Sequence, residues 1–118
     1  MMTIQPAGLA NLISSDKAFD LIDVRPQEGF NRLHVPGARS APLAKMSAPK
    51  ILHERKCAAA EPLFVIAEDR ALAGIAAGIL RGAGCTLPVV VDGGMAIWET
   101  LDLPAVHSPR FHFFERSK

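Results

Sequence analysis

Cysteine is scarce in this sequence, because Cys57 and Cys85 are the only two among 118 residues. Two cysteines cannot build the framework of several disulfides that small secreted domains use, and they do not form a zinc knuckle. An excess of charge of one sign is lacking too, since 13 basic side chains nearly balance 12 acidic ones. Without a basic block, phosphate neutralisation has no support, and we expect no nucleic-acid partner.

Long apolar runs are also absent. No stretch approaches the roughly 20 residues needed to span a bilayer. The segment 1–16 lacks the basic start and the long apolar core of a secretory signal. We therefore expect a cytoplasmic protein without a membrane partner. The length fits one domain, 1–118, which buries roughly two-thirds of its unfolded surface on folding.

Short apolar runs alternate with segments in which apolar residues have helical spacing. The predicted strands are 18–24, 62–67 and 87–94. The predicted helices are 4–15, 47–61, 71–82 and 95–101, and residues 25–43 are rich in turn formers. This order predicts an α/β fold with a central, mostly parallel sheet and helices on both faces. The 71–82 helix is apolar nearly all round, so we expect its neighbours to cover it.

The turn between the second predicted strand and the next helix raises the main functional question. It comprises Ala67, Glu68, Asp69, Arg70, Ala71 and Leu72. Turns at the carboxyl ends of parallel strands bind ligands, and the N–H groups and dipole of a following helix favour anions. A cysteine in this place would be reactive, but Ala67 offers only a methyl group. We interpret Asp69 as an N-cap, with a small-anion site as the alternative.

Two segments carry recognisable motifs. Residues 21–43 contain a strand that ends in Asp-Val-Arg, a phenylalanine, His-x-Pro-Gly-Ala and Pro-Leu; the residues are Asp23, Val24, Arg25, Phe30, His34, Pro36, Gly37, Ala38, Pro42 and Leu43. Residues 89–105 contain a double glycine before a segment that bears tryptophan, followed by Leu-Pro. In this order and spacing, the chain resembles rhodanese homology domains, the rhodanese-like family, over nearly its whole length.

The resemblance implies a position for the family's active-site loop. In active members, a cysteine that opens a six-residue loop carries sulfane sulfur. The resemblance places this cysteine at Ala67 and the arginine that closes the loop at Leu72. Without a thiol no persulfide can form, so this covalent catalysis is absent. An introduced Cys-to-Ala change would explain Ala67, but neither Leu72 nor the acidic Glu68 and Asp69.

Asp23 and Arg25 are the expected supports of this loop. In relatives this pair lies near the active loop and helps to shape it. We expect an ion pair that holds the strand to the loop. The alternative is that Arg25 supplies positive charge to a retained anion site, which would offset Glu68 and Asp69.

These residues favour a catalytically inactive rhodanese-like domain that serves as a regulatory or protein-interaction module. We expect no cofactor, and the partner is an unknown protein or a neighbouring active rhodanese domain. The alternative is a thiosulfate-type sulfurtransferase that acts through Cys57 or through a partner's thiol. It requires an exposed Cys57 within reach of the 67–72 turn, whereas Cys85 is expected at the opposite end of the sheet. A phosphatase of related fold would need the same missing cysteine and arginine.

Histidines and phenylalanines complete the candidates. We expect His34 to satisfy backbone groups of its turn. His107 and His112 do not share a helical face because Pro109 lies between them, so no metal site is predicted. The side chains of Phe111, Phe113 and Phe114 either pack on the sheet or bind a partner, and we expect a monomer or a weak dimer.

Overall fold

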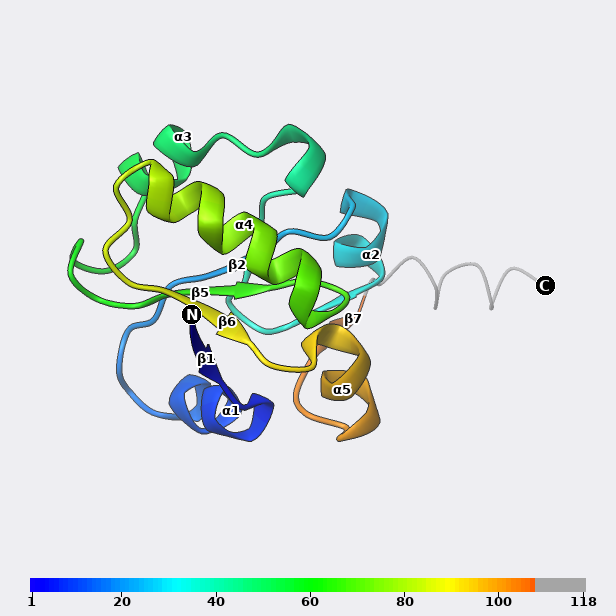
Figure 1. Ribbon diagram of the computed structural model, residues 1–118. Helices are drawn as coiled ribbons and strands as arrows, with labels where there is room; N and C mark the ends of the chain where they lie inside the picture. Colours follow the sequence, from blue (N-terminus) through cyan, green and yellow to red (C-terminus); the bar gives the residue numbers. More distant parts are fainter. Residues whose placement is uncertain (108–118) are drawn as a thin grey trace.

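The computed structural model describes residues 1–107, in which a five-stranded sheet lies between two layers of helices (Figure 1). The strand order is β1-β6-β5-β2-β4, and the four pairings between neighbours are parallel. The strands are β1 (Met2–Ile4), β2 (Leu21–Asp23), β4 (Arg39–Ser40), β5 (Leu63–Ile66) and β6 (Pro88–Val91). The predicted α/β fold with a mostly parallel sheet is therefore confirmed.

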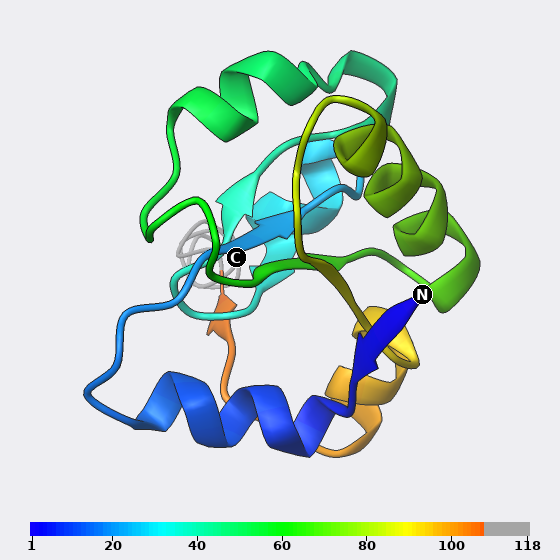
Figure 2. The same cartoon turned by 60° about the vertical axis from the view of Figure 1, so that its left-hand side comes forward.

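Two helices cover each face of this sheet (Figures 1 and 2). One face carries α1 (Pro6–Ser14) and α5 (Gly94–Thr100), and the other carries α3 (Ala48–His53) and α4 (Arg70–Gly82). The chain between β2 and α3 also forms α2 (Gln27–Arg32) and a 3-10 helix, η1 (Leu43–Lys45). A separate antiparallel pair joins β3 (Leu33–His34) to β7 (Val106–His107).

The central strand β5 divides the core into two clusters. Leu63 and Val65 pack with residues of α3 and α4, whereas Phe64 and Ile66 pack with residues of α1 and α5. Successive side chains of a strand point to opposite faces, which produces this division. All four side chains are buried, as expected of a strand covered on both faces.

A buried carboxylate ties three distant segments together at the amino end of the sheet. The side chain of Asp20 accepts hydrogen bonds from Arg55 Nε at 2.6 Å, Arg39 Nη2 at 2.9 Å and the N–H of Lys56 at 3.1 Å. Burial alone would raise the pKa of Asp20, but the hydrogen bonds from Arg55, Lys56 and Arg39 and the charge of Arg39 lower it below its ordinary value of 3.8. Asp20 therefore stays ionised without exposure to solvent.

The predicted 47–61 helix is wrong at its carboxyl end. Ser47 is its N-cap, as the sequence predicts, and its Oγ accepts from the N–H of Lys50. The helix ends at His53, however, since Arg55 and Lys56 turn toward Asp20. The turn-rich segment 25–43 likewise contains short elements that the sequence does not predict.

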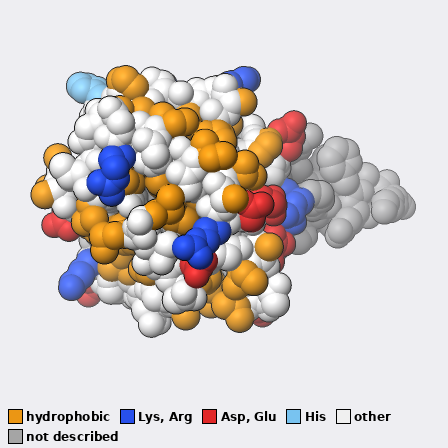
Figure 3. All heavy atoms as spheres, viewed as in Figure 1, with side chains coloured by type: hydrophobic (Ala, Val, Ile, Leu, Met, Phe, Trp, Pro, Cys, Tyr) orange, Lys and Arg blue, Asp and Glu red, His pale blue; other side chains and the backbone are white. Residues whose placement is uncertain are grey.

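The expectation that neighbours cover all of α4 is also wrong. Ala73, Ala76 and Leu80 are buried against the sheet, but Leu72, Ile75 and Ile79 are 41%, 54% and 46% exposed; we call these three residues the α4 stripe. Figure 3 shows hydrophobic side chains gathered over this side of the molecule. The stripe follows from spacing of three and four residues, which places its members on one side of a helix.

Neither α4 nor any other helix within residues 1–107 has the length and apolar character to cross a membrane. The expectations for His112, Phe111, Phe113 and Phe114 concern residues outside the described part of the chain. The same holds for the carboxyl-terminal end of the predicted domain, 1–118.

Replacing Asp20 with asparagine should lower the free energy of unfolding at pH 7 by about 3 kcal/mol, because Arg55 loses its buried counter-charge. Folding lowers the pKa of Asp20, so its charge stabilises the fold above pH 3.8 and this contribution is lost as pH falls through the folded-state pKa. Urea unfolding should show the difference between wild type and D20N shrinking only below about pH 4. The exposed Asp16→Asn change is the control, and a constant difference at low pH would contradict the prediction.

Candidate functional site

The 67–72 loop joins β5 to α4 at the carboxyl end of the sheet. Ala67 is 1% exposed and directly follows β5, and α4 begins at Arg70. Oδ1 of Asp69 accepts a hydrogen bond from the N–H of Leu72 at 3.0 Å. Asp69 is therefore the predicted N-cap of α4, and its carboxylate occupies the positive end of the helix dipole.

The first turn of α5 is hydrogen-bonded to the backbone of the loop. The N–H of Met95 donates to the carbonyl oxygen of Ala67 at 2.9 Å, and the N–H of Ala96 donates to that of Glu68 at 3.5 Å. Gly94 directly precedes Met95 and has a φ of 59°. A Cβ on Gly94 would lie 2.6 Å from the carbonyl oxygen of Ala67 and 2.5 Å from that of Glu68. Only glycine fits this contact. The double glycine is the sequence signal, but the sequence does not reveal which loop it touches.

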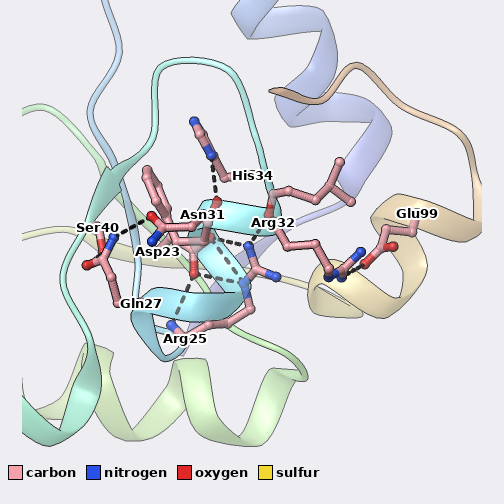
Figure 4. Close-up of polar contacts among 10 residues, drawn as sticks. Asp23, Arg25, Gln27, Asn31, Arg32, His34, Ser40 and Glu99 are labelled. Carbon is pink, nitrogen blue, oxygen red and sulfur yellow. Dashed lines mark hydrogen bonds and ion pairs between the residues drawn. The ribbon is translucent and has the colours of Figure 1, made fainter. Parts of the chain in front are cut away.

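The expected pair of Asp23 and Arg25 forms a buried ion pair beside the loop (Figure 4). Arg25 Nη2 lies 2.7 Å from Asp23 Oδ2 and donates to the carbonyl oxygen of Leu33 at 2.6 Å. Arg25 Nε donates to Asp23 Oδ1 at 3.0 Å. Arg25 is thus matched by a carboxylate with no exposed surface, as expected of a structural pair rather than a free cation.

Polar contacts help to anchor both ends of α2, which has no buried residue (Figure 4). Ser40 Oγ donates to Oε1 of Gln27 at 2.8 Å, and this contact ties α2 to β4. Arg32 lies 3.4 Å from Glu99 of α5 at the other end of the helix. The helix thereby stands beside the loop as one wall of a cleft.

A cleft of about 770 Å³ opens above Ala67, and we call it the Ala67 cleft. Its walls come from the ends of β2 and β5, from α2, η1 and the first turn of α4. The lining residues are Val24, Arg25, Pro26, Gln27, Glu28, Pro42, Leu43, Ala44, Lys45, Ala67, Glu68 and Leu72. Most of this surface is apolar and none of these residues has a thiol, a hydroxyl or an imidazole. The cleft has the size of a ligand site, but it lacks the groups used for nucleophilic sulfur transfer.

The two cysteines lie away from this cleft. Cys85 is buried between α4 and β6, at the opposite end of the sheet from the loop, as predicted. Cys57 is half-buried and lies beyond the end of α3, not within a helix as the sequence predicts. It lines a small hollow with Phe19 and Pro62 before β5 begins. The four residues of β5, about 13 Å of strand, separate that hollow from Ala67.

His34 makes structural contacts. Nδ1 of His34 lies 2.8 Å from the carbonyl oxygen of Phe30, and the two rings stack with their centroids 3.8 Å apart. His34 thus contacts the backbone at the end of α2, rather than the Pro-Gly turn that follows. Across residues 1–107, no group of three or more His, Cys, Asp or Glu side chains is placed to hold a metal ion.

Comparisons with known proteins agree with this architecture. The family model of the rhodanese-like domain matches residues 5–101. A rhodanese-like domain from Anabaena sp. has 21% identity and a TM-score of 0.78, covering 91% of this chain and 80% of that one. A rhodanese-like domain protein from Staphylococcus aureus has 23% identity and a TM-score of 0.70, with coverage of 83% and 91%.

A longer protein contains a similar unit. Thiosulfate sulfurtransferase from Pseudomonas aeruginosa has 17% identity and a TM-score of 0.79, covering 92% of this chain but only 20% of that one. At these identities the likeness concerns the fold alone. The search of curated proteins gave no match.

Gly94→Ala should lower the free energy of unfolding by about 2 kcal/mol, because the new methyl group meets two carbonyl oxygens at a strained φ. The N–H signals of Glu68 and Asp69 in a nitrogen-15 spectrum should shift with it. Gly78→Ala is the matched control, since open space surrounds Gly78 in α4 and alanine there should raise stability by up to about 1 kcal/mol. Equal stability of the two variants in urea would refute the tight contact at Gly94.

Proposed function

The chain belongs to the rhodanese-like domain family, and we propose that it is a catalytically inactive member that serves as a regulatory or protein-interaction module. One observation carries the proposal. The methyl group of Ala67 occupies the end of β5, where the family resemblance places the sulfur-carrying cysteine, at the base of an open cleft. The loop keeps its N-cap and its contact with α5, while the group that would carry sulfur is absent.

The surface around the cleft supports a binding role. Leu72 lines the Ala67 cleft and also begins the α4 stripe, so the apolar surface continues from the cleft along the helix to Ile79. Exposed apolar patches that continue over several residues are typical of interaction sites. The partner we propose is another protein or a neighbouring rhodanese domain. A neighbouring domain is consistent with the likeness to the Pseudomonas aeruginosa enzyme, in which the matching unit is one-fifth of a longer chain.

The amino-acid composition bears on the cellular location and on the other possible partners. We propose a cytoplasmic protein that is a monomer or a weak dimer and binds no nucleic acid. The nearly balanced charge and the two unpaired cysteines support this view. A small anion is not the preferred ligand, since Asp23 matches Arg25 and Asp69 caps α4.

Sulfur transfer through Cys57 receives no support from its position. Cys57 is half-buried and lies near the start of β5, whereas Ala67 follows the end of that strand. A donor bound in the Ala67 cleft would have no contact with it. A partner that inserts its own thiol is the remaining form of the enzymatic alternative.

We expect wild type to show only background activity with thiosulfate and cyanide. Ala67→Cys alone should stay near background, because Glu68 opposes an anionic donor. The double variant Ala67→Cys/Leu72→Arg should exceed Ala67→Cys by roughly fivefold, since the added guanidinium is worth on the order of 1 kcal/mol to a bound anion. Ala71→Cys is the matched control, because it adds an exposed thiol to the same loop away from the strand end.

Activity of the wild-type chain above background would overturn the proposal. Cys57→Ser would then show whether that thiol carries the sulfur. If no variant gains activity, the loop has lost more than its nucleophile, and the proposal of an inactive module stands.

A further inference from the structure

The Ala67 cleft has a charge pattern unlike that of an anion site. Three charged side chains line it without an ion-pair partner within residues 1–107: Glu28 of α2, Glu68 of the loop and Lys45 of η1. All three are exposed at the rim. Two carboxylates therefore face one ammonium group, and the rim carries an excess of one negative charge.

The other cations near the cleft are already matched. Arg25 donates to both carboxylate oxygens of Asp23 and to a backbone carbonyl, so it has little capacity left for a ligand anion. Arg70 points to Asp92, with 3.8 Å between the charged groups. Asp69 already caps the positive end of the α4 dipole. An anion that enters the cleft thus finds Lys45 as its only unmatched cation among the described lining residues.

The walls below this rim favour apolar groups. Val24, Pro42, Leu43, Ala67 and Leu72 surround the volume, and Leu72 is 41% exposed although it is large and apolar. Burying such surface against a ligand is favourable in proportion to the apolar area removed from water. A suitable ligand combines an apolar body, which fills the cleft, with a positive charge that reaches Glu28 and Glu68.

We propose that the Ala67 cleft binds a protein segment in which an apolar side chain is followed by lysine or arginine. The inference rests on the proposed function, because it assigns the docking site and the ligand chemistry of the interaction module. The apolar side chain lies over Ala67 and contacts Leu43 and Leu72. The cationic side chain lies at the rim between Glu28 and Glu68, away from Lys45. This preference is the opposite of an anion site.

Three matched probes test the proposal on the full chain labelled with nitrogen-15. Acetyl-Phe-Lys-amide should shift the N–H signals of Glu28, Lys45, Ala67 and Leu72 with a dissociation constant in the millimolar range, roughly as expected of so small a ligand. Acetyl-Phe-Glu-amide should bind about fivefold more weakly, because each rim charge acts through exposed groups. Acetyl-Gly-Lys-amide should not saturate the shifts. The N–H signal of Cys85, at the opposite end of the sheet, should not move.

Variants distinguish the contribution of the rim charges to binding from that of the apolar walls. The double variant Glu28→Gln/Glu68→Gln should bind the glutamate probe at least as tightly as the lysine probe, because Lys45 then leaves the rim with an excess of one positive charge. Salt at about 0.5 M should remove the preference in the wild type as well. Leu72→Gln should weaken the binding of both phenylalanine probes by the same factor. Glu54→Gln is the control, since Glu54 is exposed but does not line the cleft, and it should leave the fivefold preference unchanged.

Several results would overturn the proposed specificity. These are equal or tighter binding of the glutamate probe by wild type, a preference that survives in the double glutamine variant, and the absence of any shift at cleft residues. The sulfurtransferase assay on the same sample keeps the two proposals apart. A silent assay with no probe binding removes only the ligand assignment, whereas wild-type sulfurtransferase activity removes the proposed function itself.

Discussion

Parallel pairing of β2, β5 and β6 is the constraint on which the rest of the structure depends. It brings the carboxyl ends of the three strands to one end of the sheet, and a different structural feature lies at each of these ends. Asp23 and Arg25 form an ion pair after β2, Ala67 follows β5, and Gly94 lies after β6. The shape of the loop comes from these neighbours and from the Asp69 cap, whereas its chemistry depends on Ala67 and Leu72. The shape of the loop therefore does not depend on a reactive group at position 67, which is consistent with the proposed inactive module.

The charged side chains at this end of the sheet also serve its structure, because they pair with one another. Arg25 and Arg70 are present, but each lies beside a carboxylate, so neither leaves a full positive charge for a ligand. The exposed apolar side chain of Leu72 lines the cleft at the start of α4. A thiol introduced at position 67 would stand in a cleft whose walls suit apolar groups. This arrangement of side chains supports our proposal of a binding role.

Local patterns in the sequence predicted the elements that are long or that begin with a clear signal. The α4 helix, its Asp69 cap and the buried strand β5 follow from spacing and from single residues, and the structure contains each of them. The end of α3 could not be predicted, because Asp20, far away in the sequence, binds Arg55 and Lys56. The strands β1, β3, β4 and β7, of two or three residues each, were not predicted, because they depend on pairing that no local pattern reveals.

The site was predictable in position but not in character. The loop and the pair formed by Asp23 and Arg25 lie together as the motifs indicate. The contact of Gly94 with the loop and the wall supplied by α2 depend on tertiary packing. The edge strand β1 depends on it most, because Met2 pairs with Val89. During synthesis Val89–Val91 follows Met2–Ile4 by more than eighty residues, so β1 has no partner yet when β2 and β5 can already pair. Because pairing of such distant segments carries the larger loop-closure entropy, we expect the sheet to assemble from its centre and β1 to join it last.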